Sequence, residues 1–166
     1  MAALLAAACH GNLGRSAAAP APTASDSIVL ERTPCFGACP TYVLTIVGTG
    51  VTTFDGTGRL RGRYGADTLA PAAVVALFAR IDSTNVWELA DYYTPDHHDE
   101  CGRYATDAPS AVLTIERGTR RKRIDHYYGC SAAPAVLRDL EHAIDSVART
   151  DRWTAAASDL EPKPPR

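Results

Sequence analysis

Residues 41–54 read TYVLTIVGTGVTTF. A run rich in β-branched and aromatic residues, Thr41–Val47, leads into a Gly-Thr-Gly turn at 48–50, and a second such run, Val51–Phe54, follows. β-Branched and aromatic residues are enriched in strands, and glycines supply the backbone freedom of a tight turn. Two strand-like runs around a short glycine turn predict a β-hairpin, so this stretch indicates two adjacent antiparallel strands.

The sequence Val-Leu-Thr-Ile at 43–46 recurs at 112–115. The second copy belongs to the run 111–117, which is followed by a turn at Gly118-Thr119 and a further strand-like run at 120–128, so a second hairpin is predicted. The economical interpretation is a duplicated β-hairpin-plus-helix unit. The alternative is coincidence, because matches of four β-rich residues arise readily.

A helical period follows each predicted hairpin. In both places a proline, Pro71 or Pro134, precedes apolar residues that recur at helical spacing, and proline suits the first turn of a helix. The apolar positions are Val74, Leu77, Phe78 and Ile81 in the first stretch and Leu137, Leu140, Ile144 and Val147 in the second. With short strands expected at 27–31 and 59–64, these patterns predict an α+β fold, an antiparallel sheet of hairpins with two helices on one face. Residues 87–103 are polar and irregular.

Length and composition bound the organisation of the chain. Its 166 residues fit one domain, and its net charge of −2 gives no electrostatic case for a nucleic-acid partner. Residues 154–166 end in EPKPPR, a composition typical of a disordered tail, which leaves a single α+β domain at 26–153. No apolar run approaches the ~20 residues that cross a bilayer.

The N-terminal segment predicts export. Residues 1–9, MAALLAAAC, resemble a truncated bacterial lipoprotein signal. In such a signal, small residues precede a cysteine that carries a lipid, and the chain is cleaved at that cysteine. Cys9 would carry the lipid, and residues 10–25 would form a flexible tether. The alternative is an alanine-rich end with an idle cysteine. We expect an exported protein of the bacterial cell envelope, anchored to the membrane through Cys9 and facing the periplasm or the exterior.

Four cysteines remain once Cys9 is set aside, and an even number in an exported protein indicates disulfides. Four cysteines allow three pairings, among which sequence alone does not choose. In an extended chain, Cys35 and Cys39 would lie ~13 Å apart, beyond the ~4.4–6.8 Å between the Cα atoms of a disulfide. They can bridge only across a turn, which Gly37 permits. We therefore favour Cys35–Cys39 and Cys101–Cys130.

Residues 31–42, ERTPCFGACPTY, resemble the opening motif of a bacterial family known only as domain of unknown function 6438. Later segments are also similar: TDAP at 106–109, YYG at 127–129, and LRDLE at 137–141 before Trp153. The resemblance implies an exported α+β domain, often lipid-anchored, and no activity. It also implies that Cys101 and Cys130 are additions to the general pattern, which fits their mutual pairing. The motif residues are Pro34, Cys35, Phe36, Gly37, Cys39, Pro40, Thr106, Asp107, Pro109 and Gly129.

Two chemical alternatives use the cysteines and histidines. Thiol-redox chemistry at Cys35 and Cys39 is disfavoured because oxidoreductases place two residues between their cysteines, at a helix N-terminus, whereas here three intervene and a strand follows. A metal site is also conceivable, but a Cys101–Cys130 bridge would remove both sulfurs. Its ligands would come from His97, His98, Cys101, His126 and Cys130, with Asp96, Asp99 and Glu100 nearby.

The remaining patterns favour binding over catalysis. A basic run should alternate between the two faces of its strand, which indicates a solvated edge strand and no nucleic-acid patch. This run comprises Arg117, Arg120, Arg121, Lys122 and Arg123. No catalytic Ser/His/Asp set or phosphate-binding glycine loop stands out. We expect a non-enzymatic module without a cofactor that binds an envelope protein or cell-wall ligand through its sheet or the 87–103 loop.

Overall fold

The computed structural model describes residues 20–155. Cys9, the signal-like segment 1–9, most of the expected tether and the end of the expected tail lie outside the described residues. The elements in chain order are β1 (Ser27–Arg32), β2 (Tyr42–Val47), β3 (Val51–Gly56), η1 (Gly58–Leu60), β4 (Tyr64–Thr68), α1 (Pro71–Ser83), η2 (Val86–Glu88), β5 (Tyr92–Tyr93), α2 (His98–Cys101), β6 (Ser110–Arg117), β7 (Arg120–Tyr127), α3 (Ala135–Ala148) and α4 (Asp151–Thr154).

The strands form one seven-stranded sheet in the order β4-β3-β2-β1-β6-β7-β5. All neighbours are antiparallel except β5 and β7. Both predicted hairpins are confirmed, as β2–β3 and β6–β7. They flank the central strand in the same register, since Leu30 of β1 pairs with Leu44 on one side and Leu113 on the other. The two Val-Leu-Thr-Ile copies therefore occupy equivalent places beside β1.

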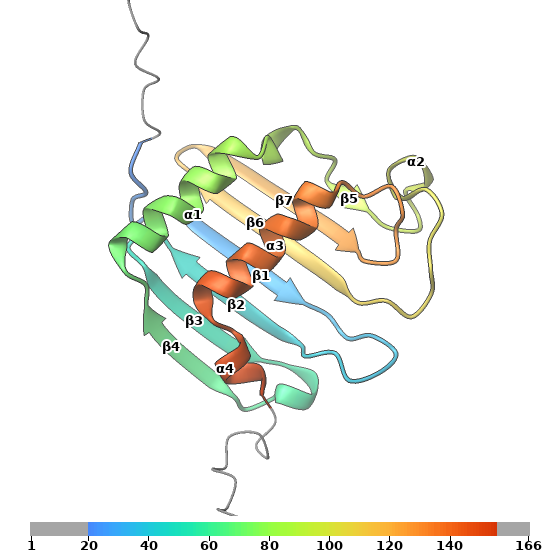
Figure 1. Cartoon of the computed structure of the whole chain (residues 1–166), viewed down its shortest axis with the longest axis horizontal. Helices are drawn as coiled ribbons and strands as arrows, with labels where there is room; N and C mark the ends of the chain where they lie inside the picture. The colour runs from blue at the N-terminus through green and yellow to red at the C-terminus, as the bar shows by residue number, and fades with distance from the viewer. Residues whose placement is uncertain (1–19, 156–166) are drawn as a thin grey trace, which may run out of the picture.

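The two long helices, α1 and α3, lie on the same face of the sheet, as predicted (Figure 1). They contact each other and bury the predicted apolar positions, among them Phe78 and Leu140, except Val147, which is partly buried. Leu30, Leu44 and Leu113 complete the core from the sheet side. Among the described residues no helix covers the opposite face. Its side chains are those that alternate with the buried ones along the strands, and they are mostly Val, Thr and charged residues. The α+β prediction is confirmed.

The chain enters the domain at the start of β1. Asp26 is buried there and accepts hydrogen bonds from the backbone N–H groups of Thr23 (2.6 Å) and Gly118 (2.7 Å). Arg117 forms an ion pair with Asp26 (2.9 Å) and donates to the carbonyl of Pro20. Residues 20–25, the described part of the expected tether, therefore contact the sheet. Among the described helices, none combines the length and apolarity needed to cross a membrane.

Three local predictions need correction. The strand expected at 59–64 is wrong: Gly58 and Gly62 adopt positive φ angles of 51° and 88°, so the chain turns through η1 and pairs only from Tyr64 onward. Residues 87–103 are less irregular than expected, since they contribute to η2 and form β5 and α2. Strand β7 is not a free edge along its whole length, because β5 pairs with its residues 125–126.

Candidate functional site

A cavity of about 210 Å³ lies where β1 ends. Its walls come from segments distant in sequence: the end of β1, the loop at residues 33–41, the start of β2, the segment before β6, the residue after β7, and α3. Two prolines and two tyrosine rings supply apolar surface, and charged groups from β1 and α3 supply polar surface. The lining residues are Arg32, Thr33, Cys39, Pro40, Tyr42, Pro109, Ser110, Tyr128, His142 and Asp145.

The Asp145 carboxylate organises the polar side of this cavity. Its Oδ2 atom accepts hydrogen bonds from Nε (3.1 Å) and Nη2 (2.7 Å) of Arg32, and its Oδ1 atom accepts one from the Tyr42 hydroxyl (2.6 Å). Arg32 is the last residue of β1 and Tyr42 is the first of β2, so the carboxylate joins both ends of the 33–41 loop to α3. A two-point guanidinium–carboxylate contact fixes direction as well as distance.

A second carboxylate, Glu141, extends the network inward. The hydroxyl of Tyr128 donates to Oε2 of Glu141 and accepts from Nη1 of Arg32. The other oxygen, Oε1, lies 3.0 Å from Nδ1 of His126, and both of these side chains are fully buried. The remaining ring nitrogen of His126 has no hydrogen-bond partner among the described residues. Six side chains thus form one connected set from the cavity wall to the core.

The surroundings of Tyr42, Tyr128 and Arg32 shift the pKa of each of these groups upward. Burial, and next the negative charge of Asp145, raise the pKa of Tyr42. Burial and the charge of Glu141 do the same for the pKa of Tyr128. Burial lowers the pKa of the Arg32 guanidinium, but the interactions with Asp145 and Tyr128 outweigh burial, so the pKa is raised. At neutral pH both hydroxyls therefore remain donors and Arg32 remains a cation, a state suited to holding a ligand or a fold in place.

The 33–41 loop forms the rim of the cavity. Cys35 and Cys39 are joined by a disulfide with a Cα–Cα distance of 5.7 Å, and Gly37 between them has a φ of 154°, which L-residues rarely adopt. The side chain of Phe36 at the tip is 88% exposed. Its backbone N–H donates to the carbonyl of Asp107 (3.2 Å), which ties the loop to the segment before β6. A large apolar group is thus held in solvent on a braced loop.

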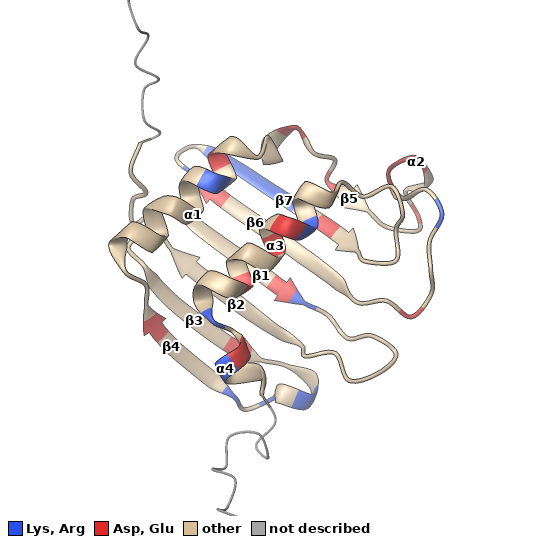
Figure 2. Cartoon of the chain, in the orientation of Figure 1, with Lys and Arg blue, Asp and Glu red and all other residues tan. Residues whose placement is uncertain are grey.

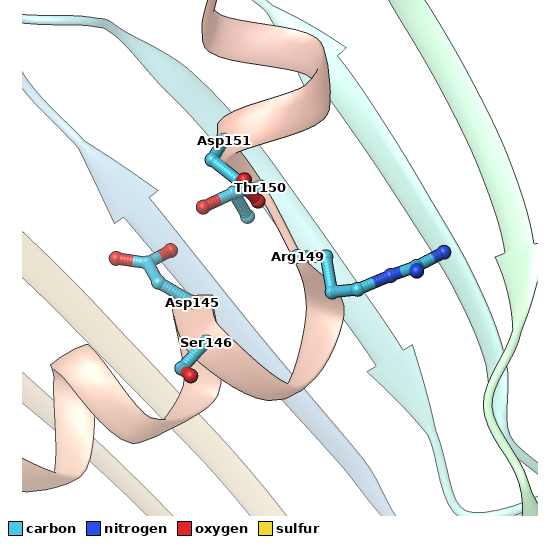
Figure 3. A pocket seen from close by; sticks show the side chains of 5 residues that line it. All are labelled: Asp145, Ser146, Arg149, Thr150 and Asp151. Carbon is cyan, nitrogen blue, oxygen red and sulfur yellow. The ribbon is translucent and has the colours of Figure 1, made fainter.

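A second hollow, of about 440 Å³, lies at the turn between α3 and α4. Figure 3 shows its five lining side chains, with that of Arg149 directed away from the carboxylates of Asp145 and Asp151. Arg149 ends α3 in a left-handed conformation, and its N–H donates to the carbonyl of Ser146 (3.1 Å). Asp145 lines both this hollow and the cavity beside the 33–41 loop, so it separates the two.

A family model described as a domain of unknown function (DUF6438) matches residues 26–148. The chain belongs to the DUF6438 family. The match spans β1 to the end of α3 and therefore includes every wall of the cavity. No curated protein matches the chain.

The cysteine pairs of this DUF6438 domain are the two that the sequence favours. The second disulfide, Cys101–Cys130, has a Cα–Cα distance of 4.6 Å and joins α2 to the segment after β7. Both of its cysteines are buried. Next to it, Tyr104 forms an isolated β-bridge with Cys130. This bridge packs the 98–104 segment against the main sheet.

The five residues considered as metal ligands do not come together. Both cysteine sulfurs are bonded to each other, and His126 is buried beside Glu141. His97 stacks on Tyr92, with ring centroids 4.5 Å apart, and hydrogen-bonds the hydroxyl of Thr94 (2.9 Å). Within residues 20–155 no group of three or more His, Cys, Asp or Glu side chains is placed to hold a metal ion. His98 lies in the single turn of α2.

The basic residues on β7 do not form one continuous patch, as expected because successive side chains of a strand point to opposite faces. Arg120 stacks on Trp87, with its Cζ atom 4.0 Å from the ring centroid. Lys122 pairs with Asp91 (2.6 Å), whereas Arg121 is largely exposed. Part of this charge therefore anchors the 86–93 segment to the sheet, a structural role that the sequence interpretation missed.

Sequence reasoning also missed the polar residues that organise the cavity. One signal was available: Glu141 shares a helix face with Leu137 and Ile144, and a charge on an apolar face indicates a buried partner. The identity of that partner was not readable, because Arg32 and His126 lie on other elements. Asp145 gave no such signal, since it is only half-buried.

Proposed function

We propose that this DUF6438 domain is a non-enzymatic binding module of the bacterial cell envelope, and that it binds a protein or cell-wall ligand at the 33–41 loop. The site differs from the sheet face and the 87–103 loop, which the sequence suggested. Phe36 offers an exposed anchor, and the cavity beside Cys39 and Pro40 offers a concave surface with fixed polar groups. Such sites, rigid and mostly apolar with a few placed polar groups, are typical of ligand recognition.

The main support for this proposal is the position of the family motifs in the structure. The segments on which the family resemblance rests are far apart in sequence, yet three of them, 31–42, 106–109 and 127–129, meet at the 33–41 loop or its cavity. Glu141, from the segment 137–141, accepts a hydrogen bond from Tyr128 in the cavity wall. Asp107 accepts the N–H of Phe36, and Pro109 and Tyr128 line the cavity. Motifs that serve only a core would be buried, whereas Phe36 and Asp107 are exposed. Exposed loop residues braced by a scaffold more often serve recognition.

The proposal places the domain outside the cytoplasm, with a lipid on Cys9. Two disulfides support an oxidising compartment. Pro20, where the described chain begins, lies at the end of β1 opposite the 33–41 loop (Figure 1). A flexible tether attached at this end of the domain would therefore leave the 33–41 loop uncovered. Replacing Cys9 with Ser should release the protein into the soluble fraction of cells, and continued membrane association would contradict the anchor.

Site-specific photocrosslinking in living cells tests the binding site. Benzoylphenylalanine at position 36 should give a discrete adduct with a protein or with cell-wall material. The matched control is Val75, which is 47% exposed on the outer side of α1, away from the loop. An adduct from both positions, or from Val75 alone, would refute a site at the 33–41 loop.

We also propose that the two hairpin-plus-helix units arose by duplication. The identical register of Leu44 and Leu113 against Leu30 supports this interpretation, since coincidental matches need not occupy equivalent places. Family members with greater identity between the two units than this chain shows would test it. A survey in which the units never align in this register would contradict it.

A further inference from the structure

A basic surface lies beside the 33–41 loop, on the turn that contains η1. Arg59 and Arg61 are both exposed there, and neither forms an ion pair or side-chain hydrogen bond with another described residue. Arg63 is engaged, since it donates to the carbonyls of Trp153 (3.1 Å) and Ala155. The 33–41 loop contains no charged residue, so it supplies no carboxylate to these two guanidinium groups (Figure 2).

The turn is fixed to the loop by reciprocal hydrogen bonds. The N–H of Thr57 donates to the carbonyl of Thr41 (2.9 Å), and the hydroxyl of Thr41 donates to the carbonyl of Thr57 (2.7 Å). A side chain at Gly58 would come within 2.6 Å of the Thr41 hydroxyl, so the approach requires glycine. Arg59 is therefore held in a defined position relative to the Cys35–Cys39 ring.

A cavity of about 320 Å³ lies between the loop and the turn. Cys39 and Pro40 line this cavity as well as the one beside Arg32, so the same stretch of loop separates the two. Its floor and walls include the side chains of Leu60, Pro40 and Ala38, with Arg59 and Arg63 among the lining groups. The space can take an apolar side chain while leaving an adjacent carboxylate within reach of a guanidinium.

We propose that the partner at this surface is an acidic protein segment, whose carboxylates pair with Arg59 and Arg61 while an apolar side chain enters the cavity and packs near Phe36. This inference rests on the proposed binding function and names the partner class. Charge complementarity argues for acidic groups, because two exposed guanidinium groups lack partners. The recessed apolar cavity argues for a peptide, since a flat anionic bilayer could pair with the arginines but would not fill it.

Fluorescence anisotropy with a labelled peptide tests the proposal. The probe is a decapeptide with four glutamates around a central leucine, and the control peptide carries serine in place of leucine. The full chain should bind the probe more tightly than the control. Arg59→Glu/Arg61→Glu should weaken binding by about tenfold or more, because attraction becomes repulsion. Phe36→Ala should also weaken it by about tenfold, as expected of an exposed anchor.

The matched control is Arg121→Glu/Arg123→Glu, which changes the net charge equally on exposed positions of β7. It should alter affinity by less than about twofold, because remote surface charges are screened. Equal losses in both double variants, no preference for leucine, or tighter binding to anionic phospholipid vesicles than to the peptide would overturn the proposal. A large gain in affinity on deleting residues 156–166 would overturn it in favour of the chain's own tail.

The two proposals fail separately. If position 36 crosslinks a partner in cells but Arg59→Glu/Arg61→Glu leaves that adduct unchanged, the acidic-segment inference is wrong and the binding function stands. If position 36 gives no adduct, the binding function itself is refuted. Melting temperatures of Arg59→Glu/Arg61→Glu and Phe36→Ala should match that of the unaltered protein, because these side chains are exposed and form no ion pair with another described residue. The control variant loses ion pairs with Glu116 and Asp125, so its affinity is compared at a temperature at which it is folded.

Discussion

At the scale of single residues, the polar network beneath the 33–41 loop shows how a few charges position a surface. Asp145 accepts three hydrogen bonds, from Arg32 and Tyr42, and thereby holds both ends of the loop against α3. The exposed part of the site therefore depends on a half-buried carboxylate that does not itself reach the loop tip.

Replacing Asp145 with Asn should lower the free energy of unfolding by about 2–3 kcal/mol, because the mostly buried Arg32 would lose the closer of its two counter-ions and keep only Glu141, at 3.6 Å. Asp151→Asn is the matched control, because Asp151 is exposed and lines, with Asp145, the hollow at the turn between α3 and α4. This substitution should lower the free energy of unfolding by less than about 1 kcal/mol. Urea unfolding followed by circular dichroism measures both. Equal costs would show that the network contributes little.

Asp26 should make stability depend on pH in the acid range. Burial raises the pKa of this carboxyl, but hydrogen bonds from Gly118, Thr23 and Arg117 outweigh burial, so the pKa lies below its ordinary value. The unfolded chain then takes up the proton first as pH falls. The stabilisation is present above the unfolded pKa of about 3.9 and is lost as pH falls through the folded value.

Asp26→Asn should therefore be less stable than the parent protein at pH 7, and the difference should shrink between about pH 5 and pH 2. Asp99→Asn, at an exposed position in α2, serves as the control and should follow the parent curve. Thermal melting across this range provides the measurement. A difference that is constant with pH would contradict the linkage.

At the scale of elements, α4 closes one end of the sheet by a contact that requires glycine. A Cβ atom at Gly65 of β4 would lie 2.3 Å from the indole of Trp153. The same indole packs against Phe54, with ring centroids 5.1 Å apart. The tryptophan thus covers β3 and β4 where α1 and α3 do not.

Gly65→Ala should displace Trp153 and lower the unfolding free energy by about 1–3 kcal/mol, because the methyl group overlaps the ring. Intrinsic fluorescence should shift to longer wavelength as the indole becomes exposed. The control is Ala66→Ser, on the next residue of the same strand, where the side chain is exposed on the other face. An unchanged spectrum in Gly65→Ala would mean that α4 does not pack as described.

At the scale of the whole molecule, the two disulfides stabilise to different extents. The Cys101–Cys130 bridge spans 29 residues and Cys35–Cys39 spans 4. Loop-closure entropy predicts about 3–4 kcal/mol for the long bridge and about 2 kcal/mol for the short one. Cys101 and Cys130 are also buried, which adds a packing loss when they are replaced.

Cys101→Ala/Cys130→Ala should therefore destabilise the protein more than Cys35→Ala/Cys39→Ala does, as measured by urea unfolding under oxidising conditions. The short-bridge variant should instead lose crosslinking at position 36, because the ring shapes the loop that carries Phe36. A larger stability loss from the short bridge, or crosslinking that survives without it, would contradict this division of roles.

The sequence by itself determined the α+β class, both hairpins and the two long helices, because these depend on local periodicity and turn residues. It favoured the cysteine pairs that the structure contains without excluding the other pairings, because Cys101 and Cys130 lie 29 residues apart. It misplaced a strand at 59–64, where Gly58 and Gly62 adopt positive φ and turn the chain, and where Leu60 is buried. Only the tertiary structure decided the site. Arg32 contacts Glu141 and Asp145, which lie about 110 positions away in the sequence. The pattern of residues along the chain does not show that these side chains are close in space.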